Sequence, residues 1–268
     1  MFRNIRRGAV AGALATTAAG IAVPALASSR AASTPRPTVV LVHGAFADSS
    51  GWDGVIERLR KDGYPVRAAS NPLRGLTSDA TDVSDVLHSI SGPIILVGHS
   101  YGGAVITAAA TGNANVKALV YVAGYAPDAG ETLRDLNSRP VEHPIPALPV
   151  RSVTITEPDG STGADLYLDP AEFRQAFAAD VDRTTAADMA DTQRPADANA
   201  LTQASTAPAW KSVPSWYLVA TQDQAIAPDL ERFMAKRAGA HTVEVASSHA
   251  AMVSHPDAVT RLIEKAAR

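Results

Sequence analysis

The sequence predicts an α/β fold in which a mostly parallel sheet is covered by helices on both faces. Short apolar runs rich in β-branched residues recur along the chain, and sequence of helix length separates them. One of these runs, residues 93–97, breaks into a glycine-rich turn and then into a run of small residues. A third observation is that residues 126–212 interrupt the alternation, which predicts a small mixed cap inserted into the domain.

Six apolar runs are predicted strands. They cover residues 38–42, 64–69, 93–97, 116–122, 216–220 and 241–246. The last run alternates more strongly than the others, which favours a position nearer the edge of the sheet.

The predicted helices lie between the strands. One starts near Ser49 or Ser50, a second covers residues 78–90, and a third follows the turn from Ala104 to Ala110. Two more begin at Pro228 and Pro256. Asp229 and Glu231 fall in the first turn of the helix at Pro228. The helix dipole favours acidic side chains at that position, which explains why both are there.

The cap has its own elements. Five prolines between residues 127 and 149 predict a stiff, irregular stretch. Residues 151–156 and 164–168 flank Asp159-Gly160 and predict a hairpin, and helical patterns follow over 170–192.

The N-terminal residues differ from the rest of the chain. Residues 1–27 have a basic head, an uncharged apolar run and the sequence Ala25-Leu26-Ala27, which together predict a bacterial export signal, by the general or the twin-arginine route. The alternative is a single membrane anchor, which Pro24 and the small residues disfavour. Residues 28–36 then form a flexible lead-in to a catalytic domain over 37–268, and the mature protein is expected to be secreted or periplasmic.

Composition narrows the possible functions. A net charge of −3 without a basic stripe gives no indication of nucleic-acid binding, and 46% hydrophobic residues support a sizeable core. The 268 residues contain no cysteine, so disulfides and a lipid on cysteine are excluded. No histidine and carboxylate cluster has the spacing of metal ligands, so we expect neither a metal nor an organic cofactor.

The turn after residues 93–97 has the form of a nucleophile elbow. Gly98-His99-Ser100-Tyr101-Gly102 stands between a predicted strand and a predicted helix, which is the context that this motif needs. Glycines at 98 and 102 remove the clashes of so tight a turn. The sequence therefore predicts Ser100 as a nucleophile at the N-terminus of a helix.

A nucleophilic serine needs a base and an acid that orients the base. His249 follows the last predicted strand directly, so its loop reaches the carboxyl edge of the sheet, where Ser100 must lie. Asp223 follows the strand at 216–220 in the same way and is the predicted acid, with Asp128, after the strand at 116–122, as the alternative. The oxyanion hole is predicted at the backbone amides of Ala45 and Tyr101, with His43 as a structural hydrogen-bonding residue.

These segments resemble the α/β-hydrolase superfamily over about residues 37–125 and 213–268. Leu41 to Ala45, Gly98 to Gly103 and Ser248 to Ala250 stand where that family has its oxyanion, nucleophile and histidine segments. Two segments, Val42-His43-Gly44-Ala45 and Pro256-Asp257, resemble the corresponding segments of one branch of the superfamily. This branch contains plant methylesterases, hydroxynitrile lyases and related bacterial esterases.

The resemblance implies an α/β-hydrolase fold whose cap shapes an apolar pocket. Aromatic and aliphatic residues near the turn and in the cap are the expected lining: Phe46, Tyr101, Tyr125, Leu168, Phe173 and Trp210. Each of them could instead pack the cap onto the core.

The leading hypothesis is a secreted serine hydrolase. Its expected substrate is a small, apolar ester, because the expected pocket is apolar. The alternatives are a hydroxynitrile lyase on the same fold and a ligand-binding protein without turnover. The plant lyases of this branch have a lysine after the catalytic histidine and a threonine beside the oxyanion hole, where this sequence has Ala250 and Gly44. These two positions favour the esterase.

Overall fold

The computed structural model describes Gly12, residues 35–157 and residues 159–268. The predicted export signal, residues 1–27, lies outside the described residues except for Gly12, and so does most of the predicted lead-in. Residues 35–268 belong to one structural unit, which contains every helix and strand named below.

A six-stranded sheet forms the centre of this unit. Its strands are β1 (Thr38–Val42), β2 (Val66–Ala69), β3 (Ile94–His99), β4 (Val116–Val122), β8 (Ser215–Ala220) and β9 (His241–Val245). They lie in the order β2-β1-β3-β4-β8-β9, and all neighbouring pairs are parallel. The prediction of a parallel sheet is confirmed, and β9 lies at an edge as its alternating sequence indicates.

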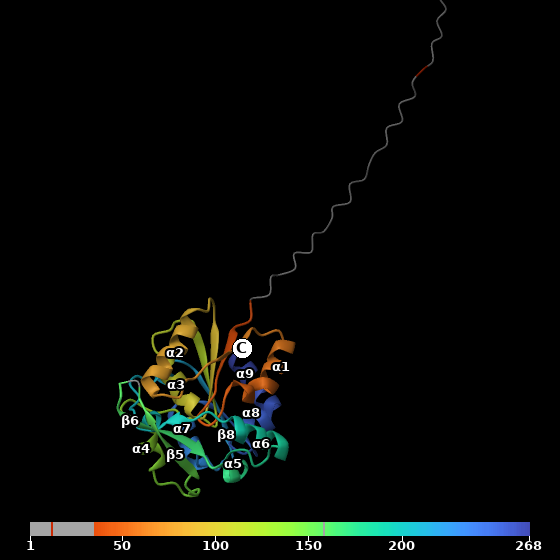
Figure 1. The fold of residues 1–268 in the computed structure, drawn as a ribbon. Helices are drawn as coiled ribbons and strands as arrows, with labels where there is room; N and C mark the ends of the chain where they lie inside the picture. Colours follow the sequence, from red (N-terminus) through yellow and green to blue (C-terminus); the bar gives the residue numbers. More distant parts are fainter. Residues whose placement is uncertain (1–11, 13–34, 158) are drawn as a thin grey trace, which may run out of the picture. The chain divides into compact units, whose positions relative to one another are not determined.

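Helices cover both faces of the sheet (Figure 1). On one face, α1 (Asp53–Lys61), α8 (Ala251–Ser254) and α9 (Pro256–Ala266) pack against the strands through a cluster that includes Trp52, Leu59 and Ile263. On the other face lie α2 (Leu76–His88), α3 (Tyr101–Ala109) and α7 (Pro228–Arg237). A 3-10 turn over Ser49–Trp52 precedes α1, and Asp48 caps it by accepting from the Ser50 amide.

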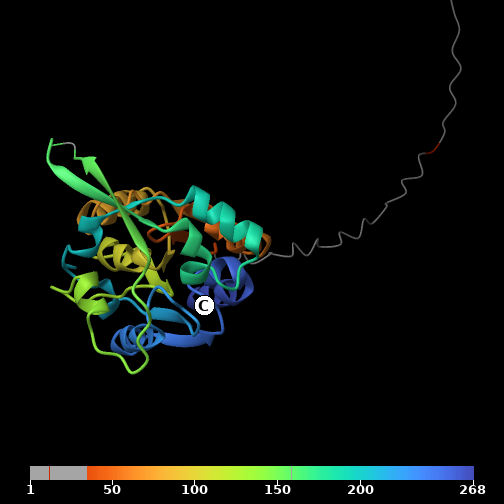
Figure 2. The same cartoon turned by 60° about the horizontal axis from the view of Figure 1, so that its bottom comes forward.

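The cap lies between β4 and β8. It contains α4 (Leu133–Asn137), β5 (Val150–Thr156), β6 (Thr162–Leu168), α5 (Pro170–Phe177), α6 (Arg183–Thr192), β7 (Ala196–Asp197) and 3-10 turns at Ala198–Leu201 and Ala209–Lys211. Strands β5, β6 and β7 form a small antiparallel sheet, so the predicted hairpin is confirmed. Figure 2 shows this hairpin as a green arm that extends from the rest of the unit.

Parallel strands place their carboxyl ends on one edge of the sheet. Ala45, Ser100, Asp223 and His249 follow β1, β3, β8 and β9 in turn. Four segments that are far apart in the sequence therefore meet at this edge.

Candidate active site

Ser100 occupies a sharp turn between β3 and α3. Its φ of 52° and ψ of −125° lie outside the conformations that an ordinary side chain prefers. The Ser100 amide donates to the Val122 carbonyl at 3.2 Å, and the Ser100 carbonyl accepts from the amides of Gly103 and Tyr125 at 2.9 and 3.0 Å. These bonds fix the strained turn.

Two glycines allow the turn to close. A Cβ at Gly98 would lie 2.5 Å from the Gly102 carbonyl oxygen, and a Cβ at Gly102 would lie 2.5 Å from that of Val42. Real Cβ atoms do not approach backbone so closely, so both positions require glycine. This is the steric requirement that the sequence motif predicts.

His249 and Asp223 are joined by a short hydrogen bond. His249 Nδ1 lies 2.5 Å from Asp223 Oδ2, and both side chains are buried. Asp223 Oδ1 accepts from the amides of Ala225 and Ile226 at 2.6 and 3.0 Å, which fixes the carboxylate. His249 Nε2 is also buried and has no hydrogen-bond partner among the described residues, so this nitrogen is free to accept a proton.

His99 connects the serine turn to the histidine loop. Its Nε2 lies 3.0 Å from the His249 carbonyl oxygen, and the two rings are 4.6 Å apart. Burial, and then the neighbouring His249, hold the pKa of His99 well below its ordinary value, so the ring is neutral and donates from Nε2. The sequence analysis did not find this positioning contact.

The segments that carry the predicted oxyanion amides adjoin Ser100. Tyr101 is the first residue of α3, where an amide has no partner within the helix. The segment before Ala45 lies directly against the serine, because a Cβ at Gly44 would be 2.6 Å from Ser100 Cβ. His43 makes local hydrogen bonds. Its Nδ1 lies 2.9 Å from the Gly44 carbonyl oxygen, and the Asn71 side-chain amide donates to the His43 carbonyl.

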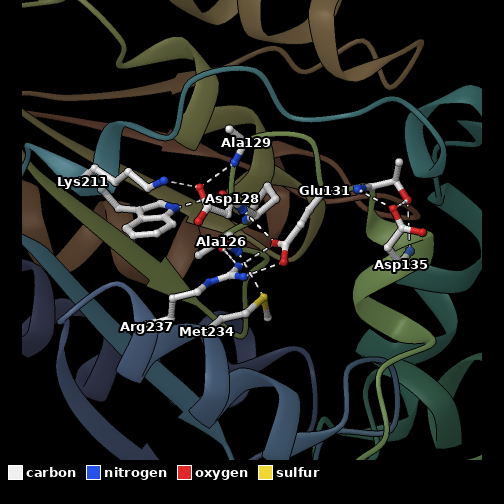
Figure 3. Close-up of polar contacts among 11 residues, drawn as sticks. Ala126, Asp128, Ala129, Glu131, Asp135, Lys211, Met234 and Arg237 are labelled. Carbon is white, nitrogen blue, oxygen red and sulfur yellow. Dashed lines mark hydrogen bonds and ion pairs between the residues drawn. The ribbon is translucent and has the colours of Figure 1, made fainter.

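Asp128, the alternative acid, belongs to a different group of charges. Its carboxylate lies 2.5 Å from Lys211 Nζ and accepts from the Ala129 amide, and the bond to Lys211 holds its pKa below the ordinary value. Figure 3 shows this pair beside a second one, in which Arg237 binds Glu131 with two nitrogens. The structure therefore pairs Asp223, and not Asp128, with His249.

Two of the predicted lining residues are turned to other partners. The Trp210 indole donates to Pro127 O at 2.9 Å, and Arg237 and Lys211 lie over its ring, so we withdraw Trp210 from the predicted lining. The Tyr101 hydroxyl donates to Asp79 Oδ2 at 2.7 Å, so the polar end of this side chain is bound to α2.

The other four lining candidates are all buried. Leu168 and Phe173 are fully buried, and Phe173 packs on Phe177, so both hold the cap to the core. Phe46 lines a narrow cleft with Met189 and Met252. Tyr125 donates to Asn137, a residue that lines a groove of about 600 Å³ between the cap and the loop before α7.

The cap contacts the histidine loop at three points that sequence reasoning missed. The Phe177 ring lies 4.8 Å from the His249 ring, and the Phe177 carbonyl accepts from the Ala250 amide at 3.1 Å. Ser248 Oγ donates to Asp180, which follows α5. The end of α5 thus fixes the residues on both sides of His249.

Glu231 lies in the first turn of α7, as predicted, but its side chain is fully buried, which the helix dipole alone does not explain. Leu230, Met234 and Ala235 are buried on the same face of α7, so helical periodicity was the signal that could have placed Glu231 inside.

The described residues contain no group of three or more histidine, cysteine or acidic side chains that could hold a metal ion. Within the same residues, none of the helices has the length and apolar character needed to cross a bilayer.

Comparison with known proteins identifies relatives over nearly the whole described unit. A family model described as "Alpha/beta hydrolase family" matches residues 39–262. The chain is 25% identical over 253 residues to "Alpha/beta hydrolase nvfD" of Aspergillus novofumigatus, which covers 87% of this chain and 97% of that protein. It is 34% identical over 110 residues to "Carbendazim hydrolyzing esterase" of a Nocardioides species, which covers 36% of this chain and 46% of that protein.

Solved structures share the fold. Polyneuridine aldehyde esterase superposes with a TM-score of 0.74 at 20% identity, over 86% of this chain and 98% of that one. A pyrethroid hydrolase from Sphingobium faniae JZ-2 superposes with a TM-score of 0.69 at 21% identity, over 86% and 97%.

Proposed function

Because this chain belongs to the alpha/beta hydrolase family, we propose that it is a serine hydrolase that cleaves carboxylic esters through an acyl-enzyme on Ser100. The observation that supports the proposal most strongly is the buried pair of His249 and Asp223, which leaves His249 Nε2 without a partner among the described residues. His99, the residue before the strained Ser100, bonds to the carbonyl of His249. Relatives named as an esterase and a hydrolase support the same class of reaction.

The proposed reaction has two halves. Ser100 Oγ attacks the ester carbonyl while His249 Nε2 takes the hydroxyl proton, and the alcohol leaves with that proton. Water then attacks the acyl-enzyme by the same route and releases the acid. Asp223 holds Nδ1–H, which fixes the tautomer of His249 and stabilises the imidazolium.

The amides of Ala45 and Tyr101 are the proposed oxyanion hole. Tyr101 follows Ser100 at the N-terminus of α3, where the helix dipole favours negative charge. Gly44 lets the segment before Ala45 lie directly against the serine, because a Cβ at Gly44 would be 2.6 Å from Ser100 Cβ.

The proposed substrate is a small, apolar ester. The surroundings of His249 are aromatic and aliphatic, with Phe177 against its ring and Phe173 behind it. Two similar proteins, a carbendazim hydrolyzing esterase and a pyrethroid hydrolase, are named for small organic substrates.

The lyase alternative is disfavoured by the residue after His249. Ala250 is fully buried, and its amide bonds to the cap at Phe177 O. A cyanide anion needs a cation near the nucleophile, and this position supplies none. An ester oxyanion needs only the backbone amides.

A substrate panel tests the proposal against both alternatives. We expect wild type to hydrolyse aryl esters of short acyl chains over many turnovers, and to release no benzaldehyde from mandelonitrile above the background rate. Faster cleavage of mandelonitrile than of phenyl acetate would establish the lyase, and stoichiometric consumption of ester would establish a binding protein.

We also propose that the mature protein starts near Ser28 and acts outside the cytoplasm, on the composition of residues 1–27. N-terminal sequencing of protein recovered from its natural host tests this. An intact Met1 in the membrane fraction would favour the anchor instead.

A further inference from the structure

Glu231 is a buried acid with an unusual hydrogen-bond arrangement. It lies in the first turn of α7 with its side chain fully buried. Its Oε2 accepts from the Ala220 amide at 3.1 Å, at the end of β8. Its Oε1 is shielded from solvent and receives no hydrogen bond from an amide or hydroxyl group of the described residues.

The nearest acid is Asp223, in the loop between β8 and α7. Both acids bond to Ala220: Glu231 Oε2 accepts from the Ala220 amide, and the Asp223 amide donates to the Ala220 carbonyl at 3.1 Å. Burial first, and then the negative charge of Asp223, raise the pKa of Glu231 well above its ordinary value. A second negative charge in this buried site is unfavourable, so Glu231 keeps its proton.

Neighbouring groups determine which acid keeps the proton. Asp223 accepts hydrogen bonds from two amides through Oδ1 and from His249 through Oδ2, so both of its oxygens already act as acceptors. Glu231 accepts from one amide only, and the neighbouring cation Arg232 is engaged with Glu244 and Asp229. The other titratable groups that face the pair are Tyr217 and Tyr125, whose pKa values burial raises, so both stay neutral.

We propose that Glu231 is a neutral carboxylic acid that donates a hydrogen bond from Oε1 to the Asp223 carboxylate, and is a positioning residue of the active site. Oε2 accepts a hydrogen bond from the Ala220 amide, so it is the carbonyl oxygen of the acid, and Oε1 carries the proton. The hydrogen-bond chain then runs from Glu231 to Asp223, and from His249 to Asp223. Its effect on turnover rests on the function proposed above, whereas the state of the proton does not.

A neutral Glu231 has two consequences. The acid ionises in the unfolded chain above about pH 4.3, so folding at pH 7 takes up one proton. Because the pKa of Glu231 is higher in the folded protein than in the unfolded chain, its contribution to the free energy of unfolding is full below the unfolded pKa. That contribution is lost as the pH rises toward the folded pKa. In the active enzyme, ionisation of Glu231 at alkaline pH would place a second charge beside Asp223 and lower turnover.

Three variants separate these effects. Glu231→Gln keeps a hydrogen-bond donor and an acceptor of the same shape but has no ionisable proton. Glu231→Leu removes both the donor and the acceptor. Glu57→Gln, at an exposed position on α1, is the matched control. Infrared spectra at pH 7 should show the carbonyl stretch of a protonated carboxylic acid in wild type and Glu57→Gln, and its loss in Glu231→Gln. Between pH 5 and 7, the unfolding equilibrium constant of wild type should rise about tenfold per pH unit relative to Glu231→Gln, measured in urea.

Turnover provides the test of the positioning role. Glu231→Gln should keep kcat within about threefold of wild type at pH 7 and lose the alkaline decline, whereas Glu231→Leu should lose about 10- to 100-fold in kcat with little change in KM. If Glu231→Leu does not fold, the pH profile of Glu231→Gln decides alone.

The inference is overturned if the protonated acid is absent at pH 7, if the stability of Glu231→Gln follows that of wild type at every pH, or if wild type and Glu231→Gln share one alkaline profile. If wild type turns over no ester, the proposed function fails, while the infrared and urea measurements still decide the protonation state of Glu231.

Discussion

His99 Nε2 lies 3.0 Å from the carbonyl oxygen of His249, so the residue before the nucleophile holds the loop of the proposed base. We expect His99→Leu to lower kcat at least about tenfold, because a small displacement of His249 weakens proton transfer from Ser100. Steady-state kinetics on an aryl ester measure this. His88→Leu, at an exposed position on α2, is the control and should leave kcat unchanged.

Acid should destabilise the fold through two buried histidines. Burial lowers the pKa of His99 and of His43 below the ordinary value, so both are neutral when folded and take up protons when unfolded. Their stabilisation is full above about pH 6.5 and is lost as pH falls from there toward the folded pKa values. Relative to His99→Leu, wild type should therefore lose up to about 1.4 kcal/mol of unfolding free energy per pH unit below that point. Urea unfolding at pH 5, 6 and 8 measures the difference, and parallel curves would contradict it.

The two aspartates considered for the acid should behave differently. Asp223→Asn should reduce kcat by about two orders of magnitude or more, because the amide no longer fixes the His249 tautomer. Asp128→Asn only breaks a pair with the half-exposed Lys211 and should leave kcat within about twofold of wild type. The reverse ranking would move the acid to the loop after β4.

Gly44 should tolerate no side chain. A Cβ there would meet Ser100 Cβ at 2.6 Å and His99 O at 2.9 Å, so Gly44→Ala must shift the serine or the oxyanion loop. We expect a loss of about 100-fold in kcat/KM with the fold retained. Gly112→Ala, where a Cβ would meet nothing, is a steric control, although its φ of 76° adds backbone strain. Wild-type activity in Gly44→Ala would argue against a need for the close contact between this loop and Ser100.

The fold and the proposed triad were accessible from sequence because their signals are local. The turn around Ser100 needs glycine at fixed positions, and Asp223 and His249 each follow an apolar strand directly. Parallel strands then bring these ends together whatever lies between them.

The rest of the site depends on packing between distant segments. Phe177 and Asp180, at and just after the end of α5 in the cap, contact the loop that carries His249. No periodic pattern in the sequence predicts which cap residue contacts which loop. Trp210 was misassigned for the same reason, since its partners Pro127 and Arg237 come from other elements. Glu231 was placed correctly in the first turn of α7, but its burial was not predicted, because the helix dipole already explains an acid at that position.

The most direct test of Ser100 as the nucleophile is the site of covalent labelling by a fluorophosphonate, with peptide mapping and ester turnover measured on the same samples. We predict one phosphonyl adduct on Ser100, loss of turnover in proportion to labelling, and a Ser100→Ala variant that folds normally but takes no label and loses about 10⁴-fold or more in kcat. An adduct on another residue, or near-wild-type turnover in Ser100→Ala, would contradict the proposed mechanism.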